Sequence, residues 1–292
     1  MTPVAFAGFR RATLVLCAFL LAGCAVLAPR YDWEDRLRGN AVVLLGEVHD
    51  NAEHHRLRLA VLRRAFAAGW RPAIAMEQFD RERQADIERA RRERPGDARH
   101  VIALAAAPIN TPGRGWNWDY YRPFVELALE YDVPLLAANL SNADTGKVAR
   151  TGYSAVFTAE NLAVLGLNAI IPPALQAAQE REIDVGHCHA LPQSAWPAMA
   201  RAQYARDAVM AAVLHEHAAR GVVLLAGNGH VRRDIGVPWW LGATEQARVF
   251  SVGYLEGSGA QAPVEYFDAV VWTVAAQRPD PCAEFTKRSG RP

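Results

Sequence analysis

Polar side chains follow four short apolar segments of the sequence, at the point where each segment ends. In chain order they are Glu47 and His49, Glu77, Asn139, and Asn228 and His230. A mixed set of carboxylates and imidazoles suits Zn, Mn, Fe or Co better than Ca or Mg. Alternatively, a carboxylate beside a histidine can act as a general base. The candidate metal-binding and catalytic residues are therefore Glu47, His49, Glu77 and His230.

Each of these residues also has a structural alternative. Glu47 could cap the helix that follows it, and Glu77 could pair with an arginine. His230 could begin a helix, with Gly229 supplying an unusual backbone angle. Their shared position favours a site, because ligands of parallel sheets bind where the carboxyl ends of the strands converge.

The apolar segments are typical of strands that are buried on both faces of a parallel sheet. They span residues 41–46, 73–76, 133–138 and 222–226, with weaker strand patterns at 248–254 and 269–274. Helical patterns between them cover 52–68, 81–94 with Asp80 as its N-cap, and 121–130. This alternation predicts an α/β fold, with a mainly parallel sheet flanked by helices.

Residues 144–220 form a block of mostly helical pattern that ends in a long helix over about 195–220. The block is too long for a simple crossover between two strands. We expect it to form a helical insertion over the carboxyl edge of the sheet. No linker-like stretch divides residues 24–292, so we expect a single domain.

An aromatic cluster follows a loop rich in glycine and proline at residues 110–119. It consists of Trp116, Trp118, Tyr120 and Tyr121. The cluster could pack the loop onto the core, or it could form a wall for a flat aromatic ligand. In the second case Tyr120, or a histidine of the His187-Cys188-His189 segment, could bind haem iron.

Composition and motifs exclude several classes of protein. Hydrophobic residues make up 51% of the chain, which argues against intrinsic disorder. A net charge of +1 argues against a broad nucleic-acid surface. The sequence contains no nucleophile elbow, P-loop or complete dinucleotide fingerprint. His215-Glu216-His217 also lacks the spacing of a zinc protease motif.

The N-terminus predicts a secretory signal. Arg10 and Arg11 precede an apolar run over residues 12–28, which is too short for a membrane anchor. Leu21-Ala22-Gly23-Cys24 resembles the bacterial lipobox, in which the cysteine is lipidated after residues 1–23 are removed. Ala25 fits sorting to the outer membrane. Loss of Arg10 and Arg11, with no acidic residue, changes the net charge from +1 to −1.

Cys188 and Cys282 are the cysteines that would stay as side-chain thiols in the mature chain. An oxidising compartment allows them to form a disulfide. The sequence does not give the distance between them, so both the bonded and the free states stay open.

Several of these motifs resemble the ChaN-like haem-binding lipoprotein family, which belongs to a wider group with TIKI proteases and erythromycin esterase-like enzymes. The resemblance rests on Gly46-Glu47-Val48-His49, Met76-Glu77, Asn139, Gln203 with Arg206-Asp207 and Met210, and Gly227-Asn228-Gly229-His230. The motifs arrive in the family's order and extend over roughly residues 42–230.

The resemblance implies two functions of different classes. The first is a lipid-anchored protein of the outer membrane, facing the periplasm, that binds haem for iron acquisition, with a haem receptor or a second copy as partner. Its candidate haem-binding residues are His187, His189, Tyr120, Tyr121 and Asn228. The second, from the wider group, is a metal-dependent hydrolase that uses Glu47, His49, Glu77 and His230.

Overall fold

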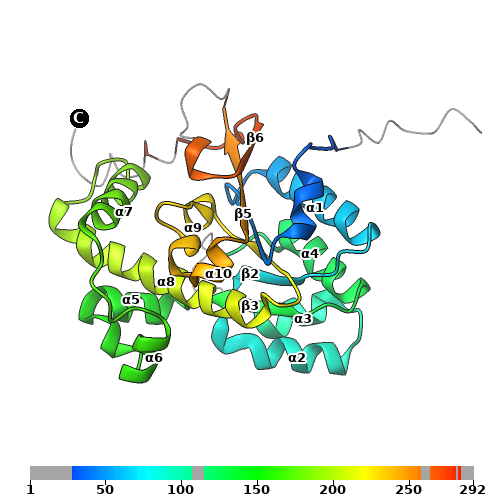
Figure 1. Cartoon of the computed structure of the whole chain (residues 1–292), viewed down its shortest axis with the longest axis horizontal. Coiled ribbons are helices and arrows are strands. Elements are labelled where there is room, and N and C mark those ends of the chain that lie inside the picture. Colours follow the sequence, from blue (N-terminus) through cyan, green and yellow to red (C-terminus); the bar gives the residue numbers. More distant parts are fainter. Residues whose placement is uncertain (1–27, 107–114, 258–263, 281, 284–292) are drawn as a thin grey trace, which may run out of the picture.

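A computed structural model describes residues 28–106, 115–257, 264–280 and 282–283 of the chain (Figure 1). The predicted signal, the lipidation site Cys24 and the glycine- and proline-rich part of the aromatic loop lie outside these residues. In the described residues the core is a parallel six-stranded sheet with the order β3-β2-β4-β1-β5-β6. Its strands are β1 (Val42–Leu45), β2 (Ala73–Asp80), β3 (Leu135–Asn139), β4 (Val222–Leu225), β5 (Val249–Glu256) and β6 (Ala269–Thr273).

Helices cover both faces of this sheet and so confirm the predicted α/β class. They are α1 (Ala52–Ala67), α2 (Gln84–Glu93), α3 (Ala98–Ala105), α4 (Trp118–Glu130), α5 (Asn142–Thr151), α6 (Ala159–Val164), α7 (Pro173–Gly186), α8 (Trp196–His217), α9 (Asn228–Val231) and α10 (Ala243–Gln246). In Figure 1 the sheet lies between α1–α4 on one side and α5–α8 on the other. Short 3-10 turns fill several connections, among them η1 (Glu34–Gly39), η2 (Arg81–Arg83) and η5 (Val237–Trp240).

The strands are apolar on both faces because each face packs against its own layer of helices. Val43 and Leu45 of β1 point into a cluster with α1 to α4. Val42 and Leu44 of the same strand point into a second cluster with the end of α8. Successive strand residues face opposite sides, so β1 has no solvent-facing position and reads as a continuous apolar run.

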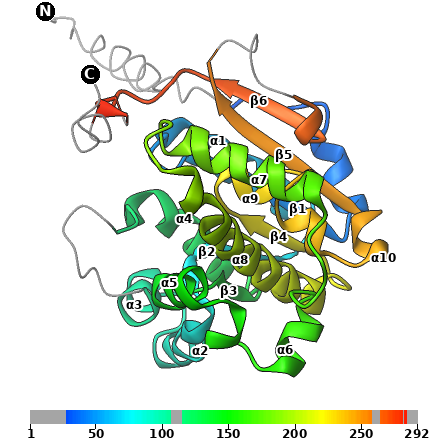
Figure 2. The same cartoon turned by 90° about the vertical axis from the view of Figure 1, so that its left-hand side faces the viewer.

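The insertion between β3 and β4 consists of α5 to α8, with a cluster of buried residues of its own. Tyr204 and Val209 belong to this cluster, whereas Met210 and Leu214 of the same helix pack on the sheet. Figure 2 shows α8 in front of the sheet, with α5, α6 and α7 beside it. Arg206 of α8 donates to Asn139 at the end of β3. This contact confirms that the insertion meets the carboxyl edge.

Some element boundaries differ from the sequence predictions. β2 continues to Asp80, which pairs with Asn139, so Glu77 lies within the strand rather than after it. The side chain of Asp80 does not cap a helix, and a 3-10 turn precedes α2. α3 was not predicted, and α4 begins at Trp118, so most of the aromatic cluster is helical.

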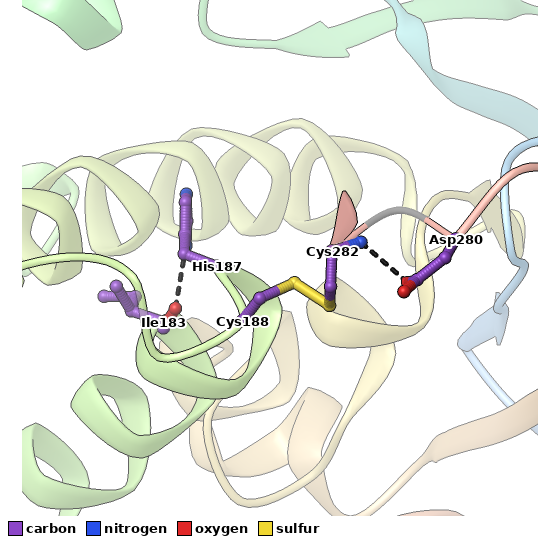
Figure 3. Close-up of a disulfide and its surroundings, with 5 residues drawn as sticks. All are labelled: Ile183, His187, Cys188, Asp280 and Cys282. Carbon is purple, nitrogen blue, oxygen red and sulfur yellow. Dashed lines mark hydrogen bonds between the residues drawn. A yellow bond between two sulfur atoms is a disulfide. The ribbon is translucent and has the colours of Figure 1, made fainter. Parts of the chain in front are cut away.

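Cys188 and Cys282 form a disulfide between residues 94 positions apart, with a Cα–Cα distance of 5.5 Å (Figure 3). The bond joins the turn after α7 to the segment that follows β6. Arg278 holds that segment against the rest of the chain through ion pairs with Asp50 and Glu256. We call residues 274–280 with Cys282 the C-terminal strap. Among the described helices, none has the length and apolar character needed to cross a membrane.

Candidate functional site

Glu47 follows β1 after Gly46 and lies buried at the carboxyl edge of the sheet. One of its oxygens forms an ion pair with Arg58 of α1, a residue that is itself completely buried. The other oxygen accepts from the Tyr121 hydroxyl at 2.6 Å and lies 2.7 Å from His49 Nδ1. Burial lowers the pKa of Arg58 to about 10, so the guanidinium stays charged at neutral pH. Burial raises the pKa of Tyr121, so its phenol stays a proton donor.

These contacts fix the orientation of the His49 ring. A carboxylate that faces a guanidinium can only accept hydrogen bonds, so Nδ1 of His49 carries the proton that it shares with Glu47. His49 places its Nε2 beside Gly227, where a Cβ would lie 3.1 Å from it. Its side chain is 48% exposed, and the ring touches the edge of Trp116 at a centroid distance of 4.8 Å.

Two other histidines of this region are structural. His55 donates from Nε2 to the carbonyl of His49 and accepts at Nδ1 from Arg58. His54 accepts at Nδ1 from the Val48 amide and donates from Nε2 to the hydroxyl of Thr273. Burial lowers the pKa of each to about 4, so both rings are neutral. One nitrogen of each ring thus holds the loop after β1, and the other is bonded to Arg58 or Thr273.

A second cluster forms where β2, β4 and α8 meet. His230 lies between two carboxylates, with Nδ1 at 2.6 Å from Asp207 and Nε2 at 3.5 Å from Glu77. Burial alone would lower the pKa of His230, but the charges of Asp207 and Glu77 raise it to about 10. Burial likewise disfavours the charged form of Glu77, yet His230 and the amide of Gly227 hold the Glu77 pKa well below its usual range. Burial keeps the pKa of Asp207 above its usual value. Of the two carboxyl groups, Glu77 is therefore the one that holds its negative charge more firmly.

The two clusters meet at Gly227, as the strand order β2-β4-β1 requires. A Cβ at this position would lie 3.0–3.1 Å from the ring of His49 and 3.8 Å from a Glu77 oxygen. A side chain at this position would crowd the His49 ring, so the glycine lets that ring lie close to the backbone beside Glu77. The four strand-end residues of the sequence prediction, Glu47, His49, Glu77 and His230, do lie together at one edge.

These four residues do not form a metal centre of the predicted kind. Glu47 already forms an ion pair with Arg58 and accepts a hydrogen bond from Tyr121. Each nitrogen of His230 faces a carboxylate. Across the described part of the chain, no group of three or more His, Cys, Asp or Glu side chains is arranged to hold a metal ion. The donor set thus does not fit the expected transition metal, and we derive no catalytic step from one.

The aromatic cluster lies against the same edge. Tyr120 stacks on His55 with a centroid distance of 4.7 Å, and Trp116 contacts both His49 and Tyr121. Trp118 packs against Phe79 of β2. Trp116 and Tyr120 are half-buried, whereas Tyr121 is buried and committed to Glu47. The two half-buried rings and His49 form the aromatic wall of the edge.

The other predicted haem-binding residues are placed differently. The side-chain amide of Asn228 donates to the carbonyl of Tyr254 and accepts from its backbone N–H. These two bonds hold α9 to β5. His189 is exposed and bonded to Asp184, and His187 bonds the carbonyl of Ile183 at the disulfide turn (Figure 3). No described contact joins either histidine to the strand-end residues.

Sequence patterns missed Arg58 and His55, because both lie within an ordinary amphipathic helix pattern. Asp207 entered only through the family resemblance. A hollow of about 460 Å³ lies elsewhere, between α6, α8 and η5. It is lined by Trp239, Trp240 and His215 and contains none of the strand-end residues.

Comparisons with known proteins agree with this architecture. A family model described as haem-binding uptake, Tiki superfamily, ChaN matches residues 33–241. The structure of ChaN of Campylobacter jejuni with cofacially bound haem matches with a TM-score of 0.63 and 20% identity, over 82% of this chain and 89% of that chain. An erythromycin esterase mutant in its open conformation gives a TM-score of 0.47 and 12% identity, over 80% of this chain and 76% of that one. No curated protein matches the sequence.

Proposed function

Because the chain belongs to the haem-binding uptake family of the Tiki superfamily that includes ChaN, we propose that it binds haem at the carboxyl edge of its sheet. The observation that carries the proposal is the aromatic wall, in which half-buried Trp116 contacts His49 and half-buried Tyr120 stacks on His55, which bonds the His49 carbonyl. Flat apolar macrocycles pack well against aromatic side chains, and histidine is a common ligand of haem iron. The residues of this edge therefore fit haem better than a bare metal ion.

The wall would contact the porphyrin through Trp116 and Tyr120. When bound, haem supplies an iron with open axial positions. The chain's own part is to exclude water from one porphyrin face.

Titration of haemin into the mature chain tests the proposal. We expect the Soret band of haemin to shift on binding, and the shift to reach saturation at micromolar haemin. Replacing Trp116 by alanine should weaken the affinity by about tenfold, because stacking on an aromatic ring is worth about 0.5–1.5 kcal/mol beyond the buried area. Replacing Trp239, which lines the remote hollow, is the matched control and should leave the titration unchanged. A parent protein without a Soret shift would refute haem binding.

We also propose that the chain is a lipoprotein of the outer membrane that faces the periplasm. The lipobox-like Leu21-Ala22-Gly23-Cys24 and the oxidised Cys188–Cys282 pair support this location. A haem protein held there by acyl chains would serve haem and iron acquisition, exchanging haem with a membrane receptor. Mass spectrometry of the mature chain should find it beginning at Cys24 with a diacylglyceryl group, and Cys24→Ser should abolish processing. An unmodified Cys24 within an intact N-terminus would overturn the proposal.

A further inference from the structure

Arginines lie at the amino edge of the sheet, at the opposite end of the strands from Glu47 and Glu77. Arg71, Arg220 and Arg248 come one or two residues before β2, β4 and β5. Arg38 comes four residues before β1. These four strands are parallel neighbours in the sheet, so their starts share one edge. Backbone hydrogen bonds join the start of β1 to that of β5, and the start of β4 to that of β2.

None of these arginines forms an ion pair within the described part of the chain. Arg38, Arg220 and Arg248 are exposed, and Arg71 lies over the ring of Tyr131 at 4.3 Å. Two more exposed arginines without a described ion pair lie close by, one in η1 above the ring of Phe250 and one near the end of α1. We call the six together the arginine edge: Arg36, Arg38, Arg63, Arg71, Arg220 and Arg248.

Negative charge does not balance the arginine edge. Three acidic side chains near the starts of the strands have cations of their own, namely Asp132 with Arg91, Asp268 with Arg233 and Glu245 with His215. Asp32, Glu130 and Glu216 are exposed carboxylates nearby in the sequence with no partner among the described residues. Six arginines therefore face three free carboxylates, and the surface is positively charged although the chain as a whole is nearly neutral.

The described chain begins on the same side of the molecule. Arg64 in the last turn of α1 donates to the carbonyls of Ala28 and Pro29, and Ala28 packs against the core. Because α1 runs back from the carboxyl edge to the start of β2, its last turn lies at the amino edge. In Figure 1 this start of the chain (blue) lies next to α1, away from α5 to α7.

The distance from Ala28 to the predicted lipid is short. Cys24 precedes Ala28 by four residues, which span at most about 14 Å when fully extended. A lipid on Cys24 would therefore hold the last turn of α1, and with it the arginine edge, close to the bilayer surface.

An exposed tryptophan lies next to the arginine edge. The side chain of Trp239 is 43% exposed, and its carbonyl accepts from Gln246, two residues before Arg248. Tryptophan is enriched where membranes meet water, because its ring is apolar and its N–H is polar. Positive charge and an exposed indole together are the features of a surface that rests on anionic lipid headgroups.

We propose that the arginine edge and Trp239 lie against a bilayer that contains anionic phospholipid, so that the carboxyl edge of the sheet faces away from the membrane. The proposal rests on the proposed lipid anchor at Cys24 and names the surface that the anchored protein turns toward the bilayer. Because every described strand runs from the amino to the carboxyl edge, the candidate site then opens into the periplasm.

Sedimentation with vesicles tests the proposal on the mature chain carrying Cys24→Ser, to which acyl chains cannot contribute. We expect this protein to sediment with vesicles of phosphatidylglycerol and phosphatidylcholine in equal parts, and to stay in solution with vesicles of phosphatidylcholine alone. Raising the salt to about 1 M, where the Debye length falls to about 3 Å, should release it. Trp239→Ala should bind more weakly and keep the salt dependence.

Two triple variants separate the arginine edge from the overall charge. Replacing Arg38, Arg220 and Arg248 together by glutamine should weaken binding about a hundredfold, since each arginine near an anionic surface contributes about fivefold. The matched control removes the same charge from three exposed arginines of α3, α5 and α7 that lack a described ion pair, namely Arg99, Arg150 and Arg181. It should bind nearly as the parent does. Thermal melting checks that both variants are folded.

Three results would overturn the proposal: a parent that sediments with neither kind of vesicle, equal sedimentation with both kinds, or equal losses in the two triple variants. A Trp239→Ala variant that binds as the parent does would remove the tryptophan from the surface. An unmodified Cys24 in cells would refute the lipid anchor instead, because the vesicle experiment does not depend on acylation.

Discussion

Replacing Arg58 by alanine should lower the free energy of unfolding by about 3–5 kcal/mol, the usual cost of leaving one partner of a buried ion pair alone. Arg58 is completely buried and binds Glu47, the carbonyl of Leu45 and His55. Its removal leaves the carboxylate of Glu47 without its cation in a site that excludes water. Urea unfolding followed by circular dichroism measures the loss.

Arg56 provides the matched control on the same helix. It pairs with Glu53 on the surface, where such ion pairs contribute at most about 1 kcal/mol. The double variant Arg58→Met with Glu47→Gln should recover much of the stability, because no buried charge is then left unpaired. A loss in Arg58→Ala no larger than in Arg56→Ala would show that Glu47 is not held as described.

Replacing Cys282 by serine should lower the free energy of unfolding by about 4–5 kcal/mol, according to the entropy of closing a loop of this length. The disulfide joins residues separated by 94 positions, so its loss restores much freedom to the unfolded chain. Thermal unfolding under oxidising conditions measures the effect. Cys188→Ser should match it.

A reductant separates this effect from damage at the substituted position. The parent in dithiothreitol should melt as the serine variant does, and the variant should not respond to dithiothreitol. Arg278→Ala breaks the ion pairs of the C-terminal strap but leaves the disulfide, so it should cost much less. If the oxidised parent and Cys282→Ser melt at the same temperature, the strap contributes nothing to stability.

The fold was largely predictable because β1 and β4 are unbroken apolar runs between clear helical patterns. The same alternation predicted that Glu47, His49, Glu77 and His230 would lie at one edge. Boundaries were less predictable at β2, where pairing with β3 extends the strand through Gln78 to Asp80. That extension depends on the neighbouring strand, which local residue preference does not reveal.

The chemistry of the edge was less predictable than its location. Residue types alone made His49 and His230 equivalent, yet one faces a single carboxylate and the other lies between two. The difference comes from Arg58 and Asp207, which sit in ordinary helical patterns. Charge pairing between separate elements of the fold therefore decides how each histidine is held.

Helix α8 has a mechanical consequence for access to this edge. Its first half packs within the insertion, its last turns pack on the sheet, and Asp207 binds His230 near the boundary. A continuous helix of 22 residues is about 33 Å long and resists bending. Through α8 the insertion is thus attached rigidly to the sheet and does not move about a hinge. A tilt of α8 would pull Asp207 away from His230, so a ligand that displaces the insertion must break this buried contact.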